Sequence, residues 1–93
     1  MTYYLLSPCK TTAGFMSTLK KKVRLDLREA ATVLREGGYN VLDAGPLLVV
    51  EKVVEVTLYR NGKMVAKTDD RDLADKSVEE IYSLILPEDG DDG

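Results

Sequence analysis

The dipeptide Asn61-Gly62 constrains the fold more than any other feature of the sequence. It separates two short segments rich in β-branched residues, and Asn-Gly between such segments is a strong signal for a β-hairpin. A two-residue loop would place lysines on the apolar face of the hairpin, whereas a three-residue loop with a bulge would keep them on the other face. We therefore predict the longer loop, which brings these residues onto one face: Val54, Val56 and Leu58 with Met64, Ala66 and Thr68.

Amphipathic helices are predicted on either side of the strand-rich region. The first begins at Asp26, a residue type that caps helices. It ends at Gly37-Gly38, where glycine can adopt the left-handed backbone conformation that terminates many helices. The second follows the aspartate-rich residues 69–72, whose negative charge suits a helix N-terminus, and it ends before Pro87. Both segments repeat apolar side chains at helical spacing, so each has one face to bury.

Strands are predicted from the segments with period-two or apolar patterns. Residues 19–25 alternate, with Lys20, Lys22 and Arg24 on the polar face of the expected strand. The other expected strands are residues 39–42, 47–50, 53–60 and 63–68.

The resulting order of strand, helix, several strands and helix predicts an α+β fold. Because both helices are amphipathic and one sheet face is polar, we expect a two-layer sandwich with an antiparallel sheet and both helices on one face. We expect residues 1–17 to be an N-terminal extension with a short apolar strand, residues 18–86 a single domain, and residues 87–93 a disordered acidic tail.

Residue usage excludes several classes of function. The chain has no histidine, which removes Ser-His-Asp and Cys-His catalysis and every histidine-containing zinc site, so we expect no enzymatic activity. Its single cysteine cannot form an intrachain disulfide, which indicates a cytoplasmic protein. No apolar run approaches the ~20 residues of a membrane span. Four of the 16 acidic residues lie in the tail, so the rest of the chain holds 13 basic and 12 acidic residues.

The sequence also contains three short motifs: Arg24-Leu25-Asp26-Leu27, Tyr39-Asn40 and Gly62-Lys63-Met64-Val65. Together, over roughly residues 18–86, they resemble one repeat of the TATA-box-binding protein family. The resemblance implies the same strand–helix–strands–helix fold, with a sheet face that could meet a nucleic acid. It also implies a homodimer, because that family builds its saddle from two repeats and this chain has one. Tyr59 falls where the family has one of its wedging phenylalanines.

The open face of the predicted sheet is the leading candidate for binding a nucleic acid or a protein. Its lysines could follow phosphates while Tyr59 stacks on a base. The alternative is an ordinary solvated face, since a solvent-facing sheet needs polar residues and Glu55 interrupts the cations. The residues assigned to this candidate interface are Lys20, Lys22, Arg24, Thr57, Tyr59, Lys63 and Lys67.

A calcium site is the competing hypothesis. Asp69, Asp70 and Asp72 could supply oxygen ligands for weak Ca²⁺ binding, as could the acidic tail, although helix capping explains the aspartates without a metal. No other cofactor is expected. Lys10-Thr11 after Cys9 only partly matches a phosphate-binding loop, so we interpret residues 7–14 as a surface loop.

Overall fold

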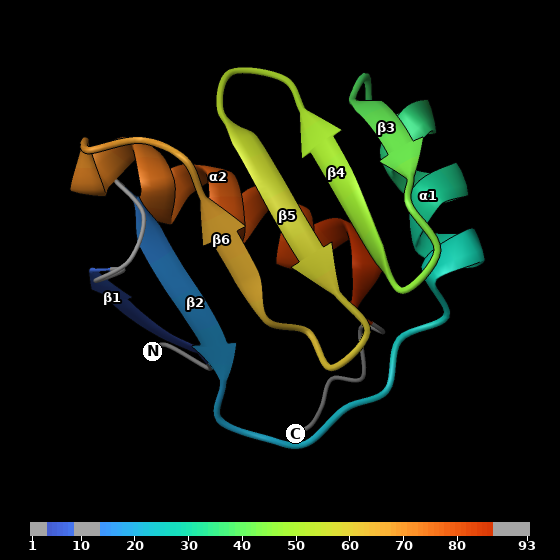
Figure 1. The fold of residues 1–93 in the computed structure, drawn as a ribbon, viewed down its shortest axis with the longest axis horizontal. Helices are drawn as coiled ribbons and strands as arrows, with labels where there is room; N and C mark the ends of the chain where they lie inside the picture. Colours follow the sequence, from blue (N-terminus) through green and yellow to red (C-terminus); the bar gives the residue numbers. More distant parts are fainter. Residues whose placement is uncertain (1–3, 9–13, 87–93) are drawn as a thin grey trace.

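The computed structural model describes residues 4–8 and 14–86, which form one antiparallel sheet and two helices. The strand order in the sheet is β1-β2-β6-β5-β4-β3. Both helices lie against the same face of the sheet, so the predicted α+β two-layer arrangement is confirmed (Figure 1). In chain order the elements are β1 (Tyr4–Pro8), β2 (Phe15–Leu19), α1 (Leu27–Glu36), β3 (Asn40–Asp43), β4 (Leu47–Glu51), β5 (Glu55–Tyr59), β6 (Met64–Ala66) and α2 (Arg71–Ile85).

The β5–β6 hairpin has the predicted register, in which apolar residues pair on the side that faces the helices: Val56 with Ala66 and Leu58 with Met64. Its loop contains three residues, 60–62. Gly62 ends this loop with a φ of 89°, a backbone conformation that favours glycine. A Cβ atom there would also meet the side chain of Leu19, which would have to shift to make room.

Both helices begin at the aspartates expected to cap them. Asp26 accepts hydrogen bonds from the backbone N–H groups of Arg28 at 3.0 Å and Glu29 at 3.3 Å. Asp70 accepts one from the N–H of Leu73 at 3.2 Å. These bonds satisfy donors that the first turn of a helix leaves without partners, and each such cap contributes about 1 kcal/mol.

The core lies between the sheet and the two helices. Burying one large aliphatic side chain there contributes roughly 1.5–3 kcal/mol, which makes this layer the main source of stability. The side chains with no exposed surface include Leu34, Leu48, Val50, Val56, Leu58, Met64, Val78, Ile81 and Tyr82.

The hydroxyl of Tyr82 is a polar group inside this core. It donates to the carbonyl oxygen of Gly62 at 2.7 Å and lies 2.9 Å from the hydroxyl of Ser17, which is also fully buried. The Tyr82 ring packs against the ring of Tyr4, with 5.2 Å between the centroids. Tyr82 therefore joins α2 to β1, to β2 and to the loop of the β5–β6 hairpin.

The predicted strand at residues 19–25 is wrong. The strand in this region is β2, which ends at Leu19, and residues 20–26 form an irregular connection that crosses below the sheet (Figure 1). This connection must carry the chain past the β5–β6 loop to α1, and the N–H of Leu25 bonds to the carbonyl of Arg60 at 2.7 Å. A chain that lies extended across an apolar surface buries every second side chain, as a paired strand does. Its polar and apolar residues therefore alternate in the same way, and this alternation led to the wrong prediction of a strand.

The predicted domain boundary at residues 17 and 18 falls inside β2. β1 and most of β2 come from the expected extension, yet β1 pairs with β2 and β2 pairs with β6 in the same sheet. Ser17 and Tyr4 are buried because they face α2. The predicted acidic tail and the loop segment containing Cys9 and Lys10-Thr11 lie outside the described residues.

Replacing Tyr82 with phenylalanine tests the importance of the buried hydroxyl. Tyr82→Phe leaves the Gly62 carbonyl and the Ser17 hydroxyl in the core without that partner, so we expect a loss of about 1–3 kcal/mol in the free energy of unfolding. Urea unfolding followed by circular dichroism measures it. The control, Tyr59→Phe on the solvent side of the sheet, should change stability by less than about 0.5 kcal/mol. Equal losses in the two variants would contradict this account.

Tyr39 lies in a second contact between layers, at the end of α1. Its side chain is buried, and the Nζ of Lys52 lies 5.0 Å from the ring centroid. Lys52 also lies 3.4 Å from a carboxylate oxygen of Glu80 on α2. Burial, with a smaller contribution from the Glu80 carboxylate, raises the pKa of Tyr39 above its ordinary value.

This raised pKa predicts a loss of stability at alkaline pH. A tyrosine in the unfolded chain ionises near pH 10, whereas Tyr39 in the folded chain stays neutral to higher pH. The stability that Tyr39 contributes is therefore complete below about pH 10 and is lost as the pH rises towards the folded-state pKa. Unfolding measured in urea from about pH 9 to pH 12 should show a steeper fall for the wild type than for Tyr39→Phe. If stability fell equally with pH in the two proteins, ionisation of Tyr39 would not be the cause of the loss.

Candidate interaction surface

The face of the sheet opposite the helices has no element of the described chain over it, and it faces the viewer in Figure 1. Strand pairing places one residue from each of five neighbouring strands in a row across this face, because directly paired residues point to the same side. Four of the five are apolar and the fifth is a threonine. In spatial order the row is Met16, Val65, Thr57, Val49 and Leu42.

Exposure is uneven along this row. Leu42, on the edge strand β3, has 64% of its surface exposed, whereas Met16, Val49, Thr57 and Val65 are half-buried by their neighbours. On β1 the partner of Met16 is the polar residue Ser7, and Leu5, which is 59% exposed, lies opposite Thr18. Four apolar residues and one threonine thus lie side by side across five strands, and we call this set the apolar row.

The two ends of the open face differ in charge. At one end Tyr59 pairs with Leu47, and the Nζ of Lys63 lies 5.8 Å from the Tyr59 ring centroid. At the other end Glu51 pairs with Glu55, and Glu55 forms an ion pair with Lys67 at 2.9 Å. One end is thus cationic and the other is net negative.

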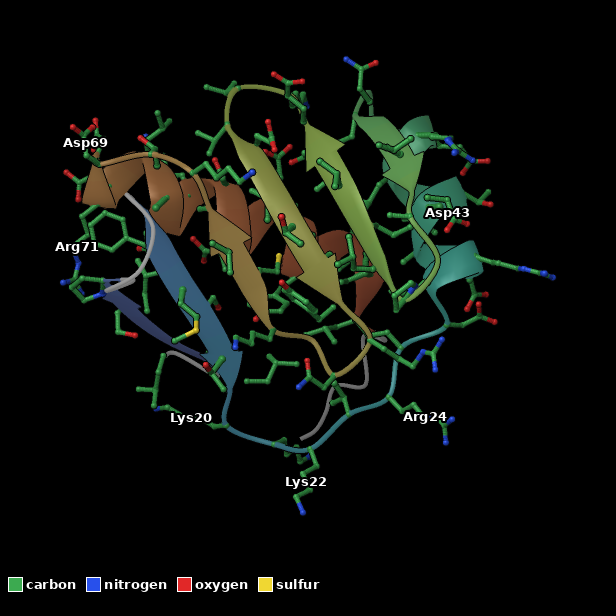
Figure 2. All side chains as sticks on the ribbon, viewed as in Figure 1. Lys20, Lys22, Arg24, Asp43, Asp69 and Arg71 are labelled. Carbon is green, nitrogen blue, oxygen red and sulfur yellow. The ribbon has the colours of Figure 1, made fainter. Side chains whose placement is uncertain are left out.

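Four of the seven residues predicted for the interface lie on this face: Thr57, Tyr59, Lys63 and Lys67. The other three do not. Lys20, Lys22 and Arg24 lie on the connection below the sheet, as the labels in Figure 2 show, so they form no basic stripe on the open face. Their position follows from the wrong strand assignment, because a side chain on an unpaired connection is not aligned with the sheet.

Sequence reasoning missed the apolar row, although a signal for part of it was present. Residues 47–50 are four consecutive apolar residues, so β4 must be apolar on both faces whichever way it is oriented. Two of them, Leu48 and Val50, are fully buried against the helices, which leaves Val49 on the open side. Met16 was missed because no strand was predicted around it.

The aspartates proposed as calcium ligands lie at the start of α2. The Asp70 carboxylate is occupied by its bond to Leu73, and Asp69 and Asp72 are exposed beside it. Among the described residues, no three acidic, cysteine or histidine side chains are grouped so that they could hold a metal ion.

Comparisons with protein-family models, with curated proteins and with solved structures gave no match. The resemblance to a repeat of the TATA-box-binding protein family therefore stays a prediction. In the part of the chain that the structure describes, neither helix has the length and apolar character needed to cross a membrane.

Proposed function

We propose that this chain is a non-catalytic interaction module that binds a protein through the open face of its sheet. The observation that carries the proposal is the apolar row, which crosses five strands with no covering element among the described residues. Contiguous exposed apolar surface with a polar rim marks interaction sites on soluble proteins. The absence of histidine from the sequence supports a non-catalytic role, and the single cysteine supports a cytoplasmic one.

A protein fits this face better than a nucleic acid does. Nucleic-acid binding depends on several cations that neutralise phosphates, and the apolar row contains none. Of the two lysines on the face, Lys67 is paired with Glu55 and Lys63 lies beside Tyr59 at one end. The centre of the face can bury apolar surface, and its ends can form polar contacts at the rim.

A second copy of this chain is the partner that the face fits best. Two identical faces related by a two-fold axis along the apolar row would place each row against the other. The same rotation exchanges the two ends, so Lys63 of one copy would approach Glu51 and Glu55 of the other. The charges of the face are therefore complementary to themselves under this rotation, as an isologous interface requires.

A charge placed in the middle of the row should prevent self-association. In a dimer, Thr57→Glu would bury a carboxylate at the centre of the proposed interface, which is unfavourable. In the monomer, position 57 faces solvent, so the glutamate should not prevent folding. Sedimentation velocity should show a dimer that dissociates on dilution for the wild type and a monomer for Thr57→Glu. Circular dichroism checks that the variant is folded.

The chain offers a matched control for this experiment. Thr32→Glu makes the same chemical change at an exposed position on α1, on the far side of the sheet, and should leave the dimer intact. A wild-type chain that is monomeric even at about 1 mM would contradict the proposal, because an interface weaker than that supplies less than about 4 kcal/mol. Loss of the dimer in both variants would contradict the assigned face.

A further inference from the structure

A group of cations lies along the edge of the molecule below the sheet, separate from the apolar row. These residues line two neighbouring hollows of about 610 and 380 Å³, formed by the connection between β2 and α1, the first turn of α1 and the turns at β3–β4 and β5–β6. We call this group the basic edge. Its members are Lys20, Lys21, Lys22, Arg24, Arg28, Arg60 and Lys63.

The basic edge carries a strong local charge in an acidic chain. Two acidic residues of the described chain line the hollows, Asp26 and Asp43, so seven cations against two aspartates give these described residues a net charge of +5. The whole chain has a net charge of −3. Positive potential is therefore concentrated on this edge, where it attracts polyanions.

Among the described residues, no carboxylate forms an ion pair with a cation of the basic edge. The ion pairs within residues 4–8 and 14–86 are Lys52 with Glu80 and Lys67 with Glu55, and neither involves the basic edge. The two aspartates in the hollows are occupied by backbone donors: Asp26 caps α1, and Asp43 accepts from the N–H of Gly45 at 2.9 Å. Within residues 4–8 and 14–86, these guanidinium and ammonium groups are therefore not taken up by ion pairs, although Lys63 lies beside the Tyr59 ring.

The backbone around the hollows is held in place without a ligand. The bond from the N–H of Leu25 to the carbonyl of Arg60 fixes the neighbouring positions Arg24 and Arg60 relative to each other. The hydroxyl of Tyr82 holds the carbonyl of Gly62 in the same loop. A site whose walls are already ordered has less conformational entropy to lose on binding.

We propose that the basic edge binds a linear chain of phosphate groups, such as inorganic polyphosphate. Arginine forks and lysine ammonium groups both bind phosphate oxygens. Among the described residues, no aromatic side chain lines either hollow, so these walls lack the aromatic rings on which nucleobases usually stack. An extended acidic peptide is a poorer fit, because it presents carboxylates to one side only at every second residue, whereas a phosphate chain has a charge on every unit. This site shares Lys63 with the open face, and its other cations lie apart from that face.

Isothermal titration calorimetry with polyphosphate tests the assignment. We expect binding at low salt that weakens steeply as salt is added, because condensed counterions are released. Arg24→Gln combined with Arg60→Gln should weaken binding at least about tenfold, since each removes a charge-assisted contact. Both side chains are exposed, so the fold should persist.

The control removes the same number of charges from α2, with Arg71→Gln combined with Lys76→Gln. Arg71 lies at the opposite side of the molecule from Arg24 in Figure 2, and both control residues are exposed. This variant should bind polyphosphate within about twofold of the wild type. Equal weakening by the two double variants, or no binding to the wild type at low salt, would overturn the proposal.

Two further ligands test whether the basic edge prefers polyphosphate to other polyanions. Oligoglutamate and oligothymidylate of matched charge should bind more weakly than polyphosphate does. If oligoglutamate bound as tightly, the edge would be a site for acidic peptides, and if oligothymidylate bound more tightly, it would be a site for single-stranded nucleic acid. Either result would replace our assignment.

Discussion

The hydroxyl of Tyr82 is the polar group on which the arrangement of layers depends. It lies in a core otherwise built from apolar side chains, where an unpaired hydroxyl would be costly, and its bonds to Gly62 and Ser17 can form only in one position of α2 against the sheet. Apolar contacts alone tolerate small shifts between layers. The hydrogen bonds specify which residues meet, so they fix β2 and the β5–β6 loop relative to the helix.

Both proposed surfaces depend on this fixed arrangement. β2 contributes Met16 to the apolar row, and it can do so only when Ser17 faces Tyr82 on the other side of the strand. The loop that contains Gly62 carries Arg60 and lies against Leu19 and Val23 of the chain that carries the basic edge. A single buried contact therefore positions elements of an apolar face and of a charged edge.

The elements predicted correctly are those for which sequence pattern and burial impose the same answer. The β5–β6 register was predictable because the alternative buries lysines, and the helix starts were predictable because Asp26 and Asp70 cap them. The prediction of a strand at residues 19–25 was wrong because alternating polar and apolar residues indicate only which side of an extended chain is buried. They do not indicate whether that chain is hydrogen-bonded to a neighbouring strand. The open face was predicted to be polar from the residues of β5 and β6 and from the expected strand at residues 19–25, which is not a strand in the structure. β2 was not predicted, and no face was assigned to the apolar run in β4, so the row they complete was not foreseen.

We propose that the open sheet face, rather than any other surface, is buried when this protein binds its partner. Amide NMR spectra of the labelled wild-type chain, recorded through a dilution series, test this directly because each strand reports separately. We expect shifts confined to β2, β3, β4, β5 and β6, largest around Val49, Thr57 and Val65, with α1 and α2 unchanged. Shifts centred on the helices, or spectra that are identical at every concentration, would contradict it.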